Sequence, residues 1–264
     1  MSSDTADDER VALSAETLAV LQSFLAERKE AEEASKKEAE DKGSTLKTSE
    51  DWQLSQFWYS AATAEFLARE VQWCLDQCGG GSGKGVAVFL SSPSAYKAFR
   101  SLRGGAPSSA EGSSGGTTTP PSTYLFEFDR RFAVFDPEFV YYDYNHPLEC
   151  LPAHLLGRVD VILLDPPFLN EECLAAFAQS VKALARPGAK VLLASGAVQM
   201  RAARDHLGLR PTQRAIEHEA GRLSNPFSLF TNYEHADTLG GWDVQLEEAY
   251  EKEEVAGGAV APQS

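Results

Sequence analysis

Cysteine is scarce in this 264-residue sequence, and its four cysteines form no paired motif. Cys74 and Cys78 lie about one helical turn apart, and Cys150 and Cys173 are isolated, so neither a disulfide framework nor a zinc site is predicted. The five histidines also lack metal-ligand spacing. No apolar run reaches the about 18 residues that a membrane span needs, and no signal peptide is recognisable. These absences favour a cytoplasmic protein without a metal ion.

The chain also lacks an excess of positive charge. Its net charge is −15, and most of that charge lies toward its ends: residues 1–51 carry 14 acidic and 7 basic side chains, and residues 234–264 carry 8 and 1. The 17 acidic and 16 basic side chains between them nearly balance. Proteins that bind the phosphates of DNA or RNA normally present a basic surface, so the composition disfavours a nucleic-acid partner.

Changes of composition divide the chain into three parts. Residues 1–50 predict an acidic N-terminal arm that is helical or disordered, with a helix between Leu13 and Asp41. Residues 51–241 hold most of the apolar segments and predict one α/β domain, interrupted at residues 104–122 by a flexible insertion of Gly, Ser, Thr and Pro. Residues 242–264 predict an acidic, disordered C-terminal tail.

The domain is organised around the segment Val159–Phe168. Its run of valine, isoleucine and leucine predicts a strand that is buried on both faces of a parallel sheet. The strand must end at Asp165, because Pro166 and Pro167 cannot donate ladder hydrogen bonds. Ligands of open α/β sheets bind beyond the carboxyl ends of the strands. We therefore expect Asp165, the two prolines and the ring of Phe168 to face a ligand.

Other predicted strands also end in carboxylates. The apolar runs predict strands at 85–90, 123–129, 138–145 and 189–195 and an antiparallel hairpin at 214–218 and 226–233. Glu127 and Asp129 end the second strand and point to opposite faces, so either one could meet a ribose hydroxyl. Asp143 ends the third strand, where it could accept an adenine amino group.

Two further segments leave their role open. The turn after the first predicted strand, Ser91-Ser92-Pro93-Ser94, lacks the acid and the glycines that usually wrap a cofactor. Its small side chains and the N-terminus of the helix that follows would still suit one. The aromatic run that contains Trp52, Phe57, Trp58 and Tyr59 could pack in the core or form the wall of a substrate pocket.

The motif Asp165-Pro166-Pro167-Phe168 resembles the Asp/Asn-Pro-Pro-Tyr/Phe motif of S-adenosylmethionine-dependent methyltransferases that modify nitrogen. Four other stretches extend the likeness: Trp52–Ser60, Phe126–Phe132, Tyr141–Asn145 and Asn225–Tyr233. With them the chain resembles the eukaryotic lysine methyltransferase family that acts on translation elongation factor 1-alpha. Members of that family were once described as adenine-N6 DNA methyltransferases. This chain departs from the pattern in carrying Phe168 where tyrosine is frequent.

The resemblance implies a Rossmann-like, seven-stranded class I methyltransferase fold, with S-adenosylmethionine as the cofactor. It assigns catalysis to Asp165, Pro166, Pro167 and Phe168; cofactor binding to Ser91, Ser92, Glu127, Asp129, Asp143, Tyr144 and Asp165; and substrate binding to Trp52, Phe57, Trp58, Tyr59 and Phe168. The expected reaction is methylation of a lysine of elongation factor 1-alpha by a monomer. An adenine-N6 methyltransferase of DNA or RNA and a non-catalytic scaffold with a decayed cofactor site are the alternatives.

Overall fold

The computed structural model describes residues 58–78, 85–104, 122–218 and 226–257. The predictions for Trp52, for Phe57 and for the arm of residues 1–50 lie outside these ranges, as does nearly all of the predicted insertion at 104–122.

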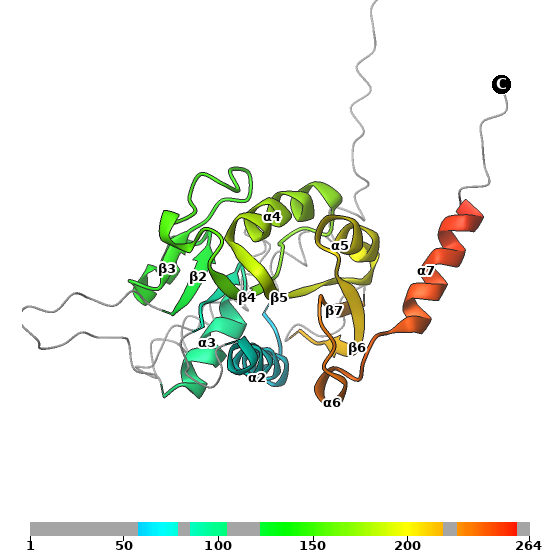
Figure 1. Cartoon of the computed structure of the whole chain (residues 1–264), viewed down its shortest axis with the longest axis horizontal. Coiled ribbons are helices and arrows are strands. Elements are labelled where there is room, and N and C mark those ends of the chain that lie inside the picture. The colour runs from blue at the N-terminus through cyan, green and yellow to red at the C-terminus, as the bar shows by residue number, and fades with distance from the viewer. Residues whose placement is uncertain (1–57, 79–84, 105–121, 219–225, 258–264) are drawn as a thin grey trace, which may run out of the picture. The chain divides into compact units, whose positions relative to one another are not determined.

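The described residues form one seven-stranded sheet in the order β3-β2-β1-β4-β5-β7-β6 (Figure 1). Strands β1 to β5 pair in parallel, and β7 is antiparallel to both β5 and β6. The strands are β1 (Ala87–Leu90), β2 (Thr123–Glu127), β3 (Phe139–Tyr141), β4 (Val159–Leu164), β5 (Ala185–Gly196), β6 (Arg210–Ile216) and β7 (Phe227–Thr231). The direction of winding reverses between β1 and β4, which is where open α/β sheets bind ligands. This topology is the Rossmann-like class I methyltransferase fold that the resemblance implies.

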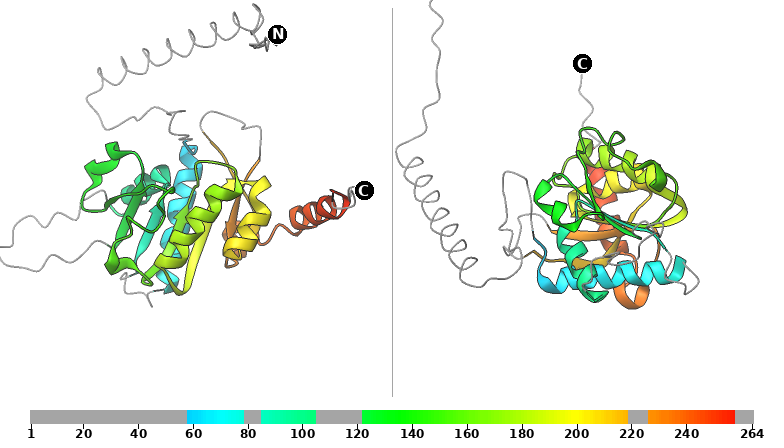
Figure 2. Two further views of the ribbon diagram at one scale, coloured as in Figure 1. Left: turned by 90° about the horizontal axis from the view of Figure 1, so that it is seen from above. Right: turned by 90° about the vertical axis from the view of Figure 1, so that its left-hand side faces the viewer.

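Helices cover both faces of the sheet (Figures 1 and 2). Alternate residues of each central strand face opposite layers: Phe89 and Leu163 pack against one side, and Leu90 and Leu164 against the other, all of them fully buried. One layer holds α2 (Ala61–Cys78), α3 (Pro93–Leu102) and α6 (Ala236–Leu239), and the other holds α4 (Glu171–Leu184) and α5 (Met200–Leu207). Short 3₁₀ helices lie at η2 (Arg130–Phe135), η3 (Ala153–Leu155) and η4 (Ala197–Gln199).

Several predicted boundaries change in the folded chain. Strand β3 ends at Tyr141, short of the predicted residue 145, because Asp143 Oδ1 accepts hydrogen bonds from the backbone and side-chain N–H groups of Asn145, both at 2.9 Å, and closes a turn. Strand β5 is longer than expected, beginning at Ala185, and the register with β4 shifts between Val159 and Val161. The predicted hairpin is present, and β6 begins already at Arg210.

The C-terminal segment differs most from its prediction. Residues 242–264 were expected to be disordered, but Val244–Gly257 form helix α7. Asp243 Oδ1 accepts the backbone N–H of Leu246 (3.0 Å), and Leu246 and Tyr250, one helical turn apart, pack against the hydrophobic cluster on the α5 side of the sheet. Arg210 binds Glu247 through two hydrogen bonds of 2.9 and 2.8 Å. The prediction is wrong for residues 244–257. Their composition is rich in charged residues, but the packing of Leu246 and Tyr250 and the contact between Glu247 and Arg210 hold the helix against the domain.

Candidate functional site

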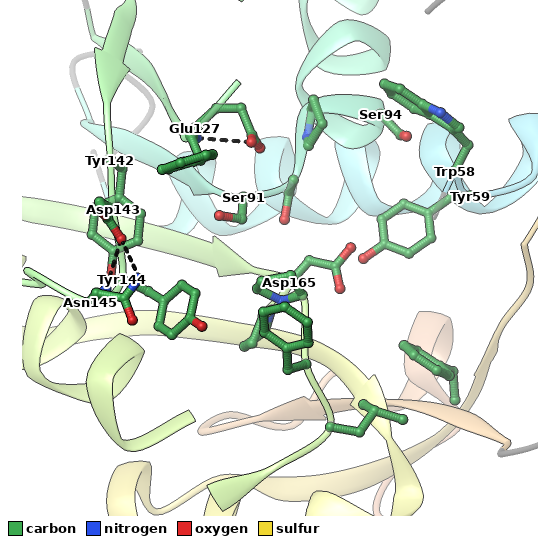
Figure 3. A pocket seen from close by; sticks show the side chains of 18 residues that line it. Trp58, Tyr59, Ser91, Ser94, Glu127, Tyr142, Asp143, Tyr144, Asn145 and Asp165 are labelled. Atoms are coloured by element: carbon green, nitrogen blue, oxygen red, sulfur yellow. Dashed lines mark hydrogen bonds between the residues drawn. The ribbon is translucent and has the colours of Figure 1, made fainter. Parts of the chain in front are cut away.

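A pocket lies at the carboxyl ends of β1 to β4, where the direction of winding reverses (Figure 3). The predicted site residues that line it are Trp58, Tyr59, Ser91, Ser92, Glu127, Asp143, Tyr144, Asp165, Pro166, Pro167 and Phe168. The fold thus brings together the ends of separate strands and the segment before α2. Lining residues that sequence reasoning missed are Pro93, Ser94, Phe128, Tyr142, Asn145, Leu169 and Phe227. Most of these adjoin a predicted residue, whereas Phe227 comes from β7 and carried no local signal.

The structure separates the two acids at the end of β2. Glu127 lines the pocket, and its Oε1 accepts the backbone N–H groups of Phe128 (2.9 Å) and Asp129 (3.2 Å). Asp129 is absent from the lining; its carboxylate accepts the backbone N–H of Arg131 (2.9 Å) and the Arg131 Nε–H (2.6 Å), which caps η2. The cofactor-binding prediction for Asp129 therefore does not match its position, because the chain turns into η2 directly after Glu127.

The turn after β1 is tight although it contains no glycine. Ser91 has a φ of +55°, a left-handed conformation that is uncommon for residues other than glycine, and its N–H donates to the carbonyl of Phe126 (2.8 Å). Ser92 is fully buried at the N-cap position of α3, and Pro93 begins the helix. Ser92, Pro93 and Ser94 line the pocket, so the N-terminus of α3 lies beside it, an arrangement that suits a ligand carboxylate.

Asp143 and Tyr144 form the side of the pocket next to β3. Tyr144 packs edge-on against Phe168, with ring centroids 5.9 Å apart and an interplanar angle of 65°. Phe168 is 40% exposed, so its ring lies at the mouth of the pocket. Together these residues give the β3 side one carboxylate and an aromatic surface.

Asp165 lies half-buried at the end of β4. Burial is the main cause that raises its pKa to about 8; the charge of Glu127 adds to this effect, and the hydroxyl of Tyr59 opposes it. The carboxyl group therefore binds a proton far more readily than an ordinary aspartate does.

Tyr59 faces Asp165 across the pocket (Figure 3). Its side chain is 2% exposed, and burial together with Asp165 raises the pKa of the phenol. Tyr59 is paired with His218 in an isolated antiparallel bridge, with ring centroids 5.3 Å apart, and the His218 ring in turn packs on Phe227 at 4.6 Å. The wall that holds Tyr59 is therefore built from the segment before α2 and from both edges of the loop between β6 and β7.

Trp58 is 8% exposed and also lines the pocket. Its ring lies 6.3 Å from that of Phe132, and Lys97 Nζ lies 4.6 Å from its centroid, a cation–π distance. The sequence left open whether the aromatic run packs in the core or forms a pocket wall. Trp58 and Tyr59 do both.

Neither a metal site nor a membrane helix is found in the part of the chain that the structure describes. No group of three or more His, Cys, Asp or Glu side chains there could hold a metal ion. None of the helices within those ranges is long and apolar enough to cross a bilayer.

The arrangement joins two chemical environments in one pocket. On the β2 and β3 side, Glu127 and Asp143 can accept hydrogen bonds from hydroxyl and amino groups of a ligand. On the other side, Asp165 faces Tyr59, and Phe168 of the same motif also lines the pocket. A cation or an amine would be stabilised there by the carboxylate and by the ring faces.

Comparisons of the sequence with a family model and with curated relatives agree on one family. Residues 50–235 match the family model described as "Probable N6-adenine methyltransferase". The chain is similar to EEF1A lysine methyltransferase 1 of Mus musculus, with 40% identity over 233 residues that cover 88% of this chain and 96% of the relative. It is also 40% identical to a protein-lysine N-methyltransferase of Caenorhabditis elegans over 235 residues, which cover 88% and 97% of the two chains. A solved structure, Aeropyrum pernix fibrillarin with bound S-adenosyl-L-methionine, is similar over 62% of this chain and 76% of that chain, at 13% identity and a TM-score of 0.36.

Proposed function

Since this chain belongs to the family of protein-lysine methyltransferases whose model is described as probable N6-adenine methyltransferase, we propose that it methylates a lysine of translation elongation factor 1-alpha. The enzyme is a protein-lysine N-methyltransferase that uses S-adenosylmethionine. The choice of substrate is supported by the mouse relative, whose name specifies EEF1A, the abbreviation of this factor, and which matches the chain over 96% of its own length.

The lining of the pocket supports S-adenosylmethionine as the bound cofactor. In this proposal Glu127 accepts the ribose hydroxyls, Asp143 accepts the adenine amino group, and the turn Ser91-Ser92 with the first turn of α3 holds the methionine carboxylate. The left-handed Ser91 supports this role, because a strained backbone at a ligand turn is maintained only when the surrounding structure enforces it. The bound cofactor supplies a methyl group on a positively charged sulfur.

The observation that carries the proposal is the position and environment of Asp165. A free lysine has a pKa of about 10.4 and is almost entirely protonated at neutral pH, so the site must remove a proton before the amine can attack. Asp165, with a pKa raised to about 8, is a much better proton acceptor than an ordinary carboxylate. In the proposed reaction its carboxylate receives a proton from the lysine ammonium or accepts a hydrogen bond from the amine, and so orients the nitrogen lone pair.

The aromatic side chains complete the amine site. Tyr59 faces Asp165, and Trp58 and Phe168 line the same pocket. Ring faces stabilise an alkylammonium group, and partial burial favours loss of its proton. The carbonyl groups of the Asp165-Pro166-Pro167 turn offer further acceptors for the amine N–H groups.

Adenine is the alternative substrate, because the description of the family model names an N6-adenine methyltransferase. The neutral exocyclic amine of adenine needs orientation but no deprotonation before attack, so it gains nothing from a carboxylate of raised proton affinity. The nearly balanced charge of residues 52–233, with 17 acidic and 16 basic side chains, also provides little attraction for a phosphate backbone.

The decisive assay measures transfer of a labelled methyl group from S-adenosylmethionine to purified elongation factor 1-alpha, with mass spectrometry to identify the modified lysine. DNA and RNA oligonucleotides are assayed in parallel at the same enzyme concentration. Label on the protein and none on the oligonucleotides is the expected result. Label on adenine with none on the protein would overturn the proposal.

A finer statement belongs to the same proposal. We infer that the enzyme acts in the cytoplasm, where elongation takes place, since the four cysteines are free as expected in a reducing compartment.

A further inference from the structure

The hydroxyl of Tyr59 has an unusual environment. It is buried, and among the described residues no group meets hydrogen-bond geometry with it. Burying a hydroxyl without a partner costs on the order of 1–3 kcal/mol, so buried hydroxyls nearly always have one. The hydroxyl points toward the carboxylate of Asp165 (Figure 3).

We propose that Tyr59 is a positioning residue that acts through Asp165: its hydroxyl points at the carboxylate and favours its ionised form already in the free enzyme, and it donates a full hydrogen bond when the substrate lysine enters, which orients Asp165 for accepting the amine proton. This inference rests on the proposed function, and it adds Tyr59 to the residues that prepare the lysine amine for methyl transfer. Catalytic hydrogen bonds are often long in the ligand-free state and shorten in the complex. This accounts for the absence of a hydrogen bond between the Tyr59 hydroxyl and Asp165 in the structure without substrate.

The backbone is anchored at Tyr59 and directly after it, which restricts the freedom of the hydroxyl. Tyr59 bridges to His218, and the N–H of the next residue, Ser60, donates to the carbonyl of Glu217 (2.9 Å). The Ser60 hydroxyl then accepts the N–H of Thr63 (3.2 Å) and begins α2. With its ring packed on His218, Tyr59 presents its hydroxyl to the pocket in one orientation.

The other ionisable groups around Asp165 act in the opposite direction or from further away. Glu127 on β2 favours the protonated form of Asp165, because like charges repel. Asp143 on β3 lines the same pocket and has the same sign. The neighbouring turn after β1 contributes only Ser91, Ser92, Pro93 and Ser94 to the lining, and His218, which is not among the lining residues, packs on the ring of Tyr59.

Tyr59 is therefore the neighbour that favours the ionised form of Asp165, which is the form able to take a proton. Without the hydroxyl, the pKa of Asp165 should rise further, and a smaller fraction of the enzyme would carry the carboxylate at neutral pH. The rate should fall at neutral pH and recover in alkaline solution. A purely structural role for Tyr59 predicts a loss that is equal at every pH.

The test is Tyr59→Phe, which keeps the ring and removes the hydroxyl. Single-turnover methylation of elongation factor 1-alpha is measured from pH 6 to 10 at saturating cofactor. The acidic limb of the profile should move to higher pH by about one unit, equivalent to about 1.4 kcal/mol. The rate of the variant should be roughly one tenth of the wild-type rate at pH 7 and nearly equal to the wild-type rate at about pH 9.5. The dissociation constant of the cofactor should not change.

Tyr233→Phe is the matched control. It also removes a buried phenol hydroxyl that faces a buried carboxylate, since Tyr233 donates to Glu70 Oε1 (2.9 Å), but neither residue lines the pocket. It should lower stability and leave the acidic limb in place. The proposal is overturned if Tyr59→Phe leaves the limb unmoved, if its deficit is independent of pH, or if Tyr233→Phe shifts the limb equally.

A second measurement separates this inference from the choice of substrate. The pKa of Asp165 can be followed by carboxyl-carbon NMR in the protein without substrate. It should be higher in Tyr59→Phe than in the wild type even if elongation factor 1-alpha proves not to be the substrate. An unchanged NMR pKa together with active methyl transfer would refute the role of Tyr59 and leave the proposed function standing.

Discussion

The backbone N–H of Asp165 donates to the carbonyl of Leu90 at 3.0 Å, which ties the end of β4 to the end of β1. Ser91, the first residue after β1, has a left-handed backbone and begins the turn into α3. This hydrogen bond continues the ladder between β1 and β4 and thus holds the proposed proton acceptor next to the proposed cofactor turn. Methyl transfer needs this kind of fixed geometry, because the amine and the methyl group must meet in line.

The first prediction concerns Asp165 itself. Asp165→Ala removes the acceptor and keeps the strand, the prolines and Phe168, so cofactor binding should persist while the single-turnover rate falls about a hundredfold or more, as expected when a near-attack geometry is lost. Near-wild-type transfer by this variant would exclude the motif as the catalytic centre.

Two companion variants identify the substrate class. Asp165→Asn keeps one acceptor oxygen but cannot take a proton from an ammonium group, so it should rescue little activity if the substrate is lysine and much more if it is adenine. Phe168→Leu should lose less activity than Asp165→Ala, because an apolar wall remains after the ring is removed. The same single-turnover assay, run on both variants, gives the order of effects.

The second prediction concerns the cofactor acids and uses Asp129 as an internal control. Glu127→Ala and Asp143→Ala should each weaken S-adenosylmethionine binding by about 1.5 to 3 kcal/mol, the range for hydrogen bonds to a charged group. Asp129→Ala removes an acid two residues from Glu127 that binds Arg131 away from the pocket lining, so it should leave the affinity unchanged and lower stability. Calorimetric titration compares the three variants. A weakened affinity in Asp129→Ala alone would reverse the assignment at β2.

The third prediction concerns stability and pH. The folded-state pKa of Asp165, about 8, lies above its ordinary value, so the folded protein binds a proton that the unfolded chain releases. The contribution of Asp165 to stability therefore declines as the pH rises from about 4 to 8 and stays low above that. Asp165→Asn removes the ionisable group and should raise the free energy of unfolding on the order of 2 kcal/mol at pH 9, with a smaller gain at pH 5. Urea titrations without cofactor at both pH values measure it, and equal gains would contradict the raised pKa.

The fourth prediction concerns α7. Deletion of residues 243–264 removes much of the C-terminal negative charge, which we expect to steer a basic protein substrate toward the site. The apparent KM for elongation factor 1-alpha should rise at low salt and kcat should remain unchanged, and the difference should shrink at physiological salt, where charges are screened beyond about 8 Å.

The anchor of α7 provides the control for that deletion. Glu247→Gln weakens the contact with Arg210 and changes the net charge by only one unit, so it separates loosening of the helix from loss of charge. It should lower stability slightly with little effect on KM. Equal KM values for the full chain and the deletion variant at every salt concentration would exclude steering.

Much of the domain was predictable because its signals are local. The apolar run of β4 stops at an aspartate and two prolines, and these residue types dictate a buried strand and a sharp exit wherever they occur. The carboxylates after β2 and β3 follow from the same alternation of strand and turn. The motif likewise indicated the chemistry, since an acid at such a strand end can bind an amine.

The tertiary structure decided what depends on contacts between distant segments. Residue order did not distinguish Glu127 from Asp129; the turn into η2 and the contact with Arg131 did. The same holds for α7, which an acidic composition predicts to be disordered and which Arg210 of β6 anchors. Tyr59 meets Asp165 only because the bridge to His218 and the start of α2 carry it over the end of β4. Burial also raises the pKa of Asp165, and burial is a property of the packed pocket rather than of any one residue.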